Sequence, residues 1–135
     1  MKEQLLNRLE NSKNYTIAVL RAMPDSSLNF RPATTLWSFA EQFNHIAYGL
    51  DWWHENYILK TELVWNPPLA KLHKDEIVSL LENAFNTIKV YIGNHEITEQ
   101  IIYGFDSTLD HVSHHRGQAT IYLRCKGITP PEYIY

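Results

Sequence analysis

Three histidines lie within one five-residue stretch, His111, His114 and His115, and two of them are four positions apart. On a helix, residues four apart lie about 40° from each other around the axis, so His111 and His115 would share one face. Two imidazoles at this spacing can bind one metal ion. His114 lies about 60° to one side of His111 and is expected to miss that ion. The pair therefore predicts two ligands of a metal site.

A tight site needs a third ligand, and His45 is the best candidate in the rest of the chain. By helical-wheel arithmetic, His45 lies more than about 100° from the apolar stripe of its own predicted helix, unlike a core histidine. Three neutral imidazoles leave a coordination position open for water or substrate. A divalent cation there would activate a bound water or deprotonate a thiol. Imidazole suits nickel, iron and copper as well as zinc, so ligand type does not name the metal.

Four further side chains could support such a site. Gln118 lies one turn beyond the histidine pair and Glu41 lies one turn before His45, so both could orient ligand rings through hydrogen bonds. Glu41, His114 and Tyr122 are the candidates for a catalytic or substrate-orienting group. Glu41 also fits the capping box of its helix, which is the role that we favour for it.

The simplest alternative gives these histidines no function. Two histidines four apart occur on many helices as half-exposed polar residues, and the H-x-x-x-H pattern is weak by itself. A polar strip where a core helix should be apolar favours the metal site without excluding the alternative. His54, His73 and His95 lie near predicted helix ends or in loops, where we expect exposure to solvent.

Apolar residues recur at helical spacing in four segments, which must position the histidines. The second helix is expected to begin at a capping box at Ser38, and the fourth at Ser107 after a loop over residues 94–106. No segment is a convincing strand. We therefore predict an all-α fold, a four-helix bundle that forms one domain over residues 1–135. The predicted helices span about residues 2–22, 38–59, 74–92 and 107–126.

Composition limits the classes of partner. The chain has 135 residues, of which 44% are apolar, and its net charge of −3 comes with scattered Lys and Arg, so nucleic acid is not an expected partner. No secretory signal and no run of 18 apolar residues is present, so we expect no membrane association. The single cysteine, Cys125, fits a reducing compartment. These features predict a cytoplasmic protein.

Two stretches, RPATTLWSFAEQFNHIAYGLDWW and LDHVSHHRGQATIYLRCKGITPP, resemble the DinB/YfiT-like family of small metal-binding four-helix proteins. The resemblance spans nearly the whole chain, and its most distinctive part is the run H-H-R-G-Q. It implies that His45, His111 and His115 bind a divalent metal, most often nickel or zinc. It also implies a cytoplasmic and frequently homodimeric protein. The family name comes from induction by DNA damage and says nothing about binding DNA.

The resemblance also implies an activity. Relatives use the metal to activate a low-molecular-weight thiol for transfer to an electrophile, or are described as metal-dependent hydrolases. We therefore expect a metal-dependent thiol S-transferase or hydrolase that acts on a small-molecule electrophile. The alternative is a non-catalytic metal-binding protein that serves in stress or ligand sensing.

The topology that the resemblance implies, up-down-down-up, makes the second and fourth helices antiparallel. The predicted helix starts place His45 ~10 Å, and the midpoint of the His111 and His115 pair ~9 Å, from the beginning of their helices. These positions would align naturally only in parallel helices. Either the two helices are staggered or the topology differs.

Overall fold

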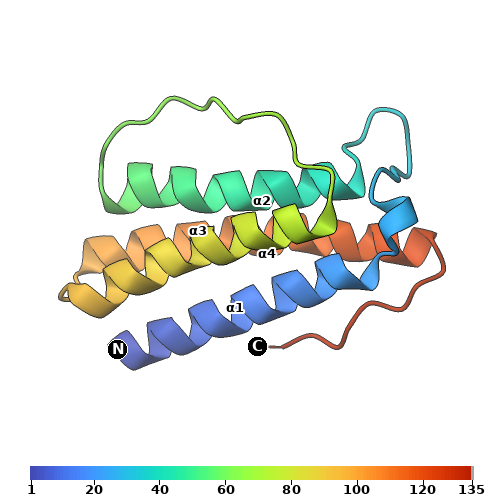
Figure 1. The fold of residues 1–135 in the computed structure, drawn as a ribbon. Helices are drawn as coiled ribbons and strands as arrows, with labels where there is room; N and C mark the ends of the chain where they lie inside the picture. Colours follow the sequence, from blue (N-terminus) through green and yellow to red (C-terminus); the bar gives the residue numbers. More distant parts are fainter. Residues whose placement is uncertain (135) are drawn as a thin grey trace.

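The computed structural model describes residues 1–134, which form four long helices and no β-strand within that range. Helices α1 and α4 run in one direction and α2 and α3 in the other, which gives the up-down-down-up topology (Figure 1). The predicted all-α, four-helix bundle is thus confirmed. The helices are α1 (Lys2–Ala22), α2 (Phe39–Trp53), α3 (Lys74–Asn94) and α4 (Glu99–Cys125), and α2 continues into a π-helical turn over His54–Ile58.

Helix α2 begins where its capping box predicts. The Ser38 hydroxyl accepts a hydrogen bond from the Glu41 amide at 3.1 Å, and the Glu41 carboxylate accepts one from the Ser38 amide at 3.3 Å. Both bonds satisfy amides that a helix start otherwise leaves unpaired. The apolar stripe that follows faces the core, with Phe39, Phe43, Ile46 and Leu50 fully buried. Burial of each such side chain stabilises the fold by about 1.5–3 kcal/mol.

Helix α4 begins at Glu99, so the prediction of a loop over residues 94–106 and a start at Ser107 was wrong. The residue that caps α4 is Thr98, whose hydroxyl accepts a hydrogen bond from the Ile101 amide at 3.2 Å. Ser107 lies inside the helix. Because the additional turns bury Ile101 and Phe105, tertiary packing supports a helix that local pattern alone did not indicate.

Gly104 lies in these additional turns of α4, where a helical glycine costs about 1 kcal/mol relative to alanine. A Cβ at this position would lie 2.6 Å from the Cγ1 atom of Ile58 and 3.0 Å from the Tyr57 carbonyl oxygen. The glycine therefore lets α4 pack closely against the π-helical turn. This contact depends on a distant segment and is invisible in the local sequence.

The earlier start of α4 removes the conflict over helix direction. The midpoint of His111 and His115 now lies ~21 Å from the start of α4, and His45 lies ~9 Å from the start of α2. Both positions are near the middle of the bundle. The histidines can therefore meet although the two helices are antiparallel.

Residues 59–73, called here the crossover segment, connect α2 to α3 without regular structure and run back along the outside of α2 (Figure 1). Three side chains four residues apart on α2, those of Asn44, Tyr48 and Trp52, form hydrogen bonds with its backbone. These bonds supply partners for backbone amides and carbonyls of a segment that has no regular structure. The bonded groups are the amide and carbonyl of Lys71 (2.7 and 2.8 Å), the amide of Asn66 (2.8 Å) and the carbonyl of Leu63 (3.0 Å).

His73 and His95 are exposed as predicted, whereas the prediction of exposure for His54 was wrong. Only 3% of His54 is exposed, because it lies one turn after Leu50 on the apolar stripe of α2, and its ring lies 5.1 Å from the ring of Tyr91 in α3. Across residues 1–134, every helix is too short or too polar to cross a bilayer.

Candidate metal centre

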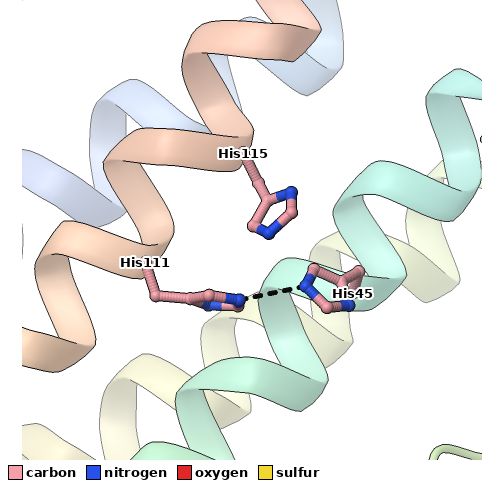
Figure 2. A group of neighbouring side chains, drawn as sticks. All are labelled: His45, His111 and His115. Carbon is pink, nitrogen blue, oxygen red and sulfur yellow. Dashed lines mark hydrogen bonds between the residues drawn. The ribbon is translucent and has the colours of Figure 1, made fainter.

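Three histidines from two helices meet between α2 and α4 (Figure 2). His45 comes from α2, and His111 and His115 come from successive turns of α4. One ring nitrogen of each lies within 4.8 Å of the other two, and the Nε2 atoms of His45 and His111 are 3.0 Å apart. The structure thus brings together all three residues that the sequence analysis selected.

The spacing and chemistry of this cluster suit a small divalent ion. Zinc bound to imidazole at about 2.0–2.1 Å with tetrahedral angles would place the nitrogens about 3.3 Å apart. The nitrogens of His45 and His111, 3.0 Å apart, are close to that separation, and all three nitrogens lie within 4.8 Å of one another. Within residues 1–134, no other group of three histidine, cysteine or carboxylate side chains has metal-binding geometry.

All three imidazoles are neutral at pH 7. Burial lowers the pKa of His111 to about 4 and that of His115 to about 3, and the neighbouring His45 contributes to both shifts. Burial also lowers the pKa of His45. Metal binding requires the unprotonated ring, so the fold presents these ligands in the form that a cation needs.

The same pKa shifts predict that the metal-free protein loses stability in acid. Because the folded-state pKa values of His111 and His115, about 4 and 3, lie below their ordinary value of 6.5, the unfolded chain binds more protons between these limits. This contribution to stability is therefore present above pH 6.5 and is lost as the pH falls towards 3. Urea unfolding of the metal-free protein at a series of pH values measures it.

The control for this prediction is His115→Gln, which removes one of the rings whose pKa the fold lowers. We expect its free energy of unfolding to fall less steeply between pH 6.5 and pH 4 than that of the wild type. Identical slopes in the two proteins would contradict a role for the histidine cluster in acid sensitivity.

Gln42, which the sequence analysis did not single out, fixes the orientation of His115. The Tyr122 hydroxyl donates to the Trp37 carbonyl at 2.7 Å, so it can accept from the Gln42 side-chain amide at 3.3 Å. This leaves the Gln42 carbonyl oxygen facing His115 Nδ1 at 3.2 Å. Nδ1 of His115 therefore carries the proton, and its Nε2 lone pair is free for a metal. A buried glutamine on the apolar stripe of α2 was the available signal for this role.

Gln118, which was predicted to orient a ligand ring, lies behind Gln42 and further from the histidine cluster. Its side-chain oxygen accepts from Gln42 at 2.9 Å, and its nitrogen lies 3.1 Å from Nε2 of the exposed His114. It reaches His115 only through Gln42.

The remaining candidates for catalysis are occupied by structural contacts. Glu41 completes the capping box and forms an ion pair with Arg31 at 3.3 Å. Tyr122 is buried and hydrogen-bonded to Trp37 and Gln42. None of these candidates is therefore a base that is free of structural contacts and lies beside the three rings.

Besides the 3.0 Å contact of its Nε2 with His45, the ring of His111 is held by packing. The ring of Trp53 stacks on it with a centroid distance of 4.5 Å and an angle of 14°. On α2, a Cβ added to Gly49 would lie 2.6 Å from His111 Nδ1 and still closer to Cε1. Nδ1 is buried and has no hydrogen-bond partner in residues 1–134. Only the absence of a side chain at position 49 gives this ring its space.

Two partly exposed tryptophans lie beside the cluster. The Trp37 ring lies 4.5 Å from that of His45 and 5.9 Å from that of His115, and the Trp65 ring lies 5.3 Å from that of His45. Trp37 precedes α2 and Trp65 belongs to the crossover segment, with 44% and 39% of their surfaces exposed. Apolar rings thus border the histidines.

Arg116, which follows the histidine pair, is directed towards α1. Its guanidinium donates to the Ser12 carbonyl and to the Ser12 and Thr16 hydroxyls at 3.3 Å, and it lies 4.8 Å from the centre of the Tyr15 ring. The arginine of the H-H-R-G-Q run therefore fixes α4 against α1.

These features define a small all-α protein in which the second and fourth helices of a bundle bring together three histidines that are suited to a metal. The chain belongs to the DinB superfamily, whose sequence profile matches residues 8–119.

Solved structures with a similar fold include two DinB-like proteins. A DinB-like protein from Bacillus cereus ATCC 10987 is 22% identical, with a TM-score of 0.78 over 98% of this chain and 97% of that one. A proposed member of the DinB family from Exiguobacterium sibiricum 255-15 is 17% identical, with a TM-score of 0.69 over 93% of this chain and 92% of that one. Among curated proteins no match is found.

Proposed function

We propose that His45, His111 and His115 bind one divalent metal ion, nickel or zinc, and that an open coordination position accepts a thiol or water. The convergence of three imidazole nitrogens within 4.8 Å carries this proposal. It is supported by the lowered pKa values of all three rings and by membership of the DinB superfamily. A set of three imidazoles is typical of catalytic rather than structural zinc sites.

We further propose that the protein is a metal-dependent thiol S-transferase or hydrolase that acts on a small electrophile. A divalent ion supplies acidity, because it lowers the pKa of a bound water or thiol. The protein contributes orientation: Gln42 holds the proton of His115 on Nδ1, and Trp53 with Gly49 holds the ring of His111. Trp37 and Trp65 offer apolar surface to a substrate beside the cluster.

One observation favours a non-catalytic alternative, a metal-binding protein for stress response or ligand sensing. The side chains best able to move a proton, Glu41 and Tyr122, are held in structural hydrogen bonds, and His114 contacts Gln118. A transferase would need such a base less than a hydrolase would, because a metal ion held by the three histidines would itself lower the pKa of a thiol.

A thiol panel distinguishes these functions. Cysteine, coenzyme A and glutathione are each mixed with 1-chloro-2,4-dinitrobenzene, with and without added nickel or zinc, and release of chloride is measured. A transferase gives a metal-dependent rate with at least one thiol in the wild type but not in His111→Ala. If the protein binds metal and no combination exceeds the metal-free rate, the thiol transferase is excluded and the non-catalytic function is favoured over it.

Loss of the Gln42 contact should weaken metal binding. Gln42→Leu removes the acceptor for His115 Nδ1, and loss of such a partner typically costs about 10–100-fold in metal affinity. Gln42→Glu keeps an acceptor and should restore most of it. Competition with a chromogenic zinc chelator measures the affinity. Gln118→Leu is the matched control, because Gln118 reaches His115 only through Gln42; an equal loss in both leucine variants would contradict the proposed role.

A further inference from the structure

A cavity of about 280 Å³ lies beside the histidine cluster, between α2, α3 and the crossover segment. His45 borders it, whereas His111 and His115 do not. Its volume is near the lower limit of about 300 Å³ for small-molecule sites. Its apolar walls include Trp37, Ala47, Pro67, Pro68 and Leu80.

The hydrogen bonds from α2 to the crossover segment hold this cavity open. Asn44 and Tyr48, which line it, bond to the backbone of Lys71 and Asn66 and so fix the segment that carries the two prolines. The proline rings further restrict this part of the backbone. The cavity is thus bounded by an anchored segment.

Three charged residues line the cavity, and one acid among them lacks a partner. Glu41 is paired with Arg31 and bound in its capping box. No hydrogen bond or ion pair joins the Asp51 carboxylate to another residue of 1–134, and none links it to Lys71, the only basic residue in the lining. Asp51 is exposed to solvent, yet partial desolvation and the nearby Glu55 raise its pKa. A cation beside this carboxylate would relieve both effects.

We propose that the cavity binds a small, largely apolar molecule that carries a protonated amine, with the ammonium group beside Asp51 and the apolar part between Pro67, Pro68 and Leu80. Binding does not require a metal. Because His45 borders both the cavity and the histidine cluster, a bound molecule would touch the ring whose Nε2 atom faces His111. A ligand of this cavity would thereby lie next to the candidate metal centre.

The test titrates the metal-free full chain, labelled with ¹⁵N, with benzylamine, benzyl alcohol and benzoate, which share one apolar ring and differ in charge. We expect saturable amide shifts for benzylamine at residues 47–51 and 69–71. In Asp51→Asn, the affinity for benzylamine should fall about fivefold, to that for benzyl alcohol. This is the loss expected when a partly exposed ion pair that contributes about 1 kcal/mol is removed. Glu55→Gln is the control for nearby charge and should retain most of the affinity.

A second variant tests the location. Leu80→Trp should fill the cavity and remove binding of all three probes. Absence of saturable binding, equal affinity for the amine and the alcohol, unchanged affinity in Asp51→Asn, or shifts centred on His111 and His115 would each overturn the proposal. Metal content of Asp51→Asn, measured separately, should equal that of the wild type, so failure of this proposal and failure of the metal site give different results.

Discussion

Replacement of His111 by alanine is expected to abolish stoichiometric metal binding. His45, His111 and His115 are the only three suitable side chains within 4.8 Å of one another in residues 1–134, so the variant retains two ligands and no substitute. We expect about one ion per chain in the wild type and none in the variant after dialysis. Elemental analysis of protein purified without a histidine tag measures this. His45→Ala, which acts from the opposite helix, should give the same result.

His114→Ala is the matched control for His111→Ala. His114 lies on the same helix and is exposed, and its contact is with Gln118 rather than with the cluster. Its metal content should equal that of the wild type. Equal losses in the two variants, or a wild type without metal, would contradict the site.

Thermal stability gives an independent measure of the same site. A ligand that binds only the folded state at 100 times its Kd stabilises that state by about 2.7 kcal/mol. Added zinc should therefore raise the Tm of the wild type and of His114→Ala and leave that of His111→Ala unchanged.

Gly49→Ala should also disrupt the metal site, although this residue offers no ligand atom. The new Cβ would lie 2.6 Å from His111 Nδ1, and the stacked Trp53 ring closes another side of the imidazole. The ring must therefore move, which separates its Nε2 from that of His45. We expect metal affinity to fall by at least about 100-fold, towards that of a two-ligand site, measured by competition with a zinc chelator.

The matched control is Gly117→Ala in α4. Both glycines lie inside helices, and no atom lies within 4 Å of a Cβ added at position 117. Gly117→Ala should raise the free energy of unfolding by about 0.5–1 kcal/mol and leave metal affinity unchanged. If Gly49→Ala gave the same two results, the close approach of α2 to His111 would be refuted.

Local signals predicted much of the fold. The second helix begins at its capping box because Ser38 and Glu41 satisfy each other's amides within one turn, and the apolar spacing predicted the third helix to within two residues of its end. The start of α4 could not be predicted in this way. It depends on the packing of Gly104 against Tyr57 and Ile58, which is a contact between segments far apart in the chain.

The histidine cluster was predictable because its residues are uncommon side chains with characteristic spacing and a distinctive family resemblance. The residues that surround the cluster were less predictable from the sequence. The only sequence signal for Gln42 was a polar residue on the apolar stripe of α2, which does not indicate a contact with His115, and the burial of His54 one turn after Leu50 was overlooked. The cavity beside Asp51 depends on the course of the crossover segment, for which helical periodicity makes no prediction.

The hydrogen bonds from Asn44, Tyr48 and Trp52 also determine where the chain can change length. They lie on the same helix as His45, and one residue inserted between His45 and Tyr48 would turn Tyr48 and Trp52 about 100° relative to Asn44 and His45. Such an insertion would break the alignment of the three side chains that hold the crossover segment. Extra residues in the crossover segment between its bonded positions, by contrast, would bulge into solvent and leave the side chains of Asn44, Tyr48 and Trp52 aligned along α2.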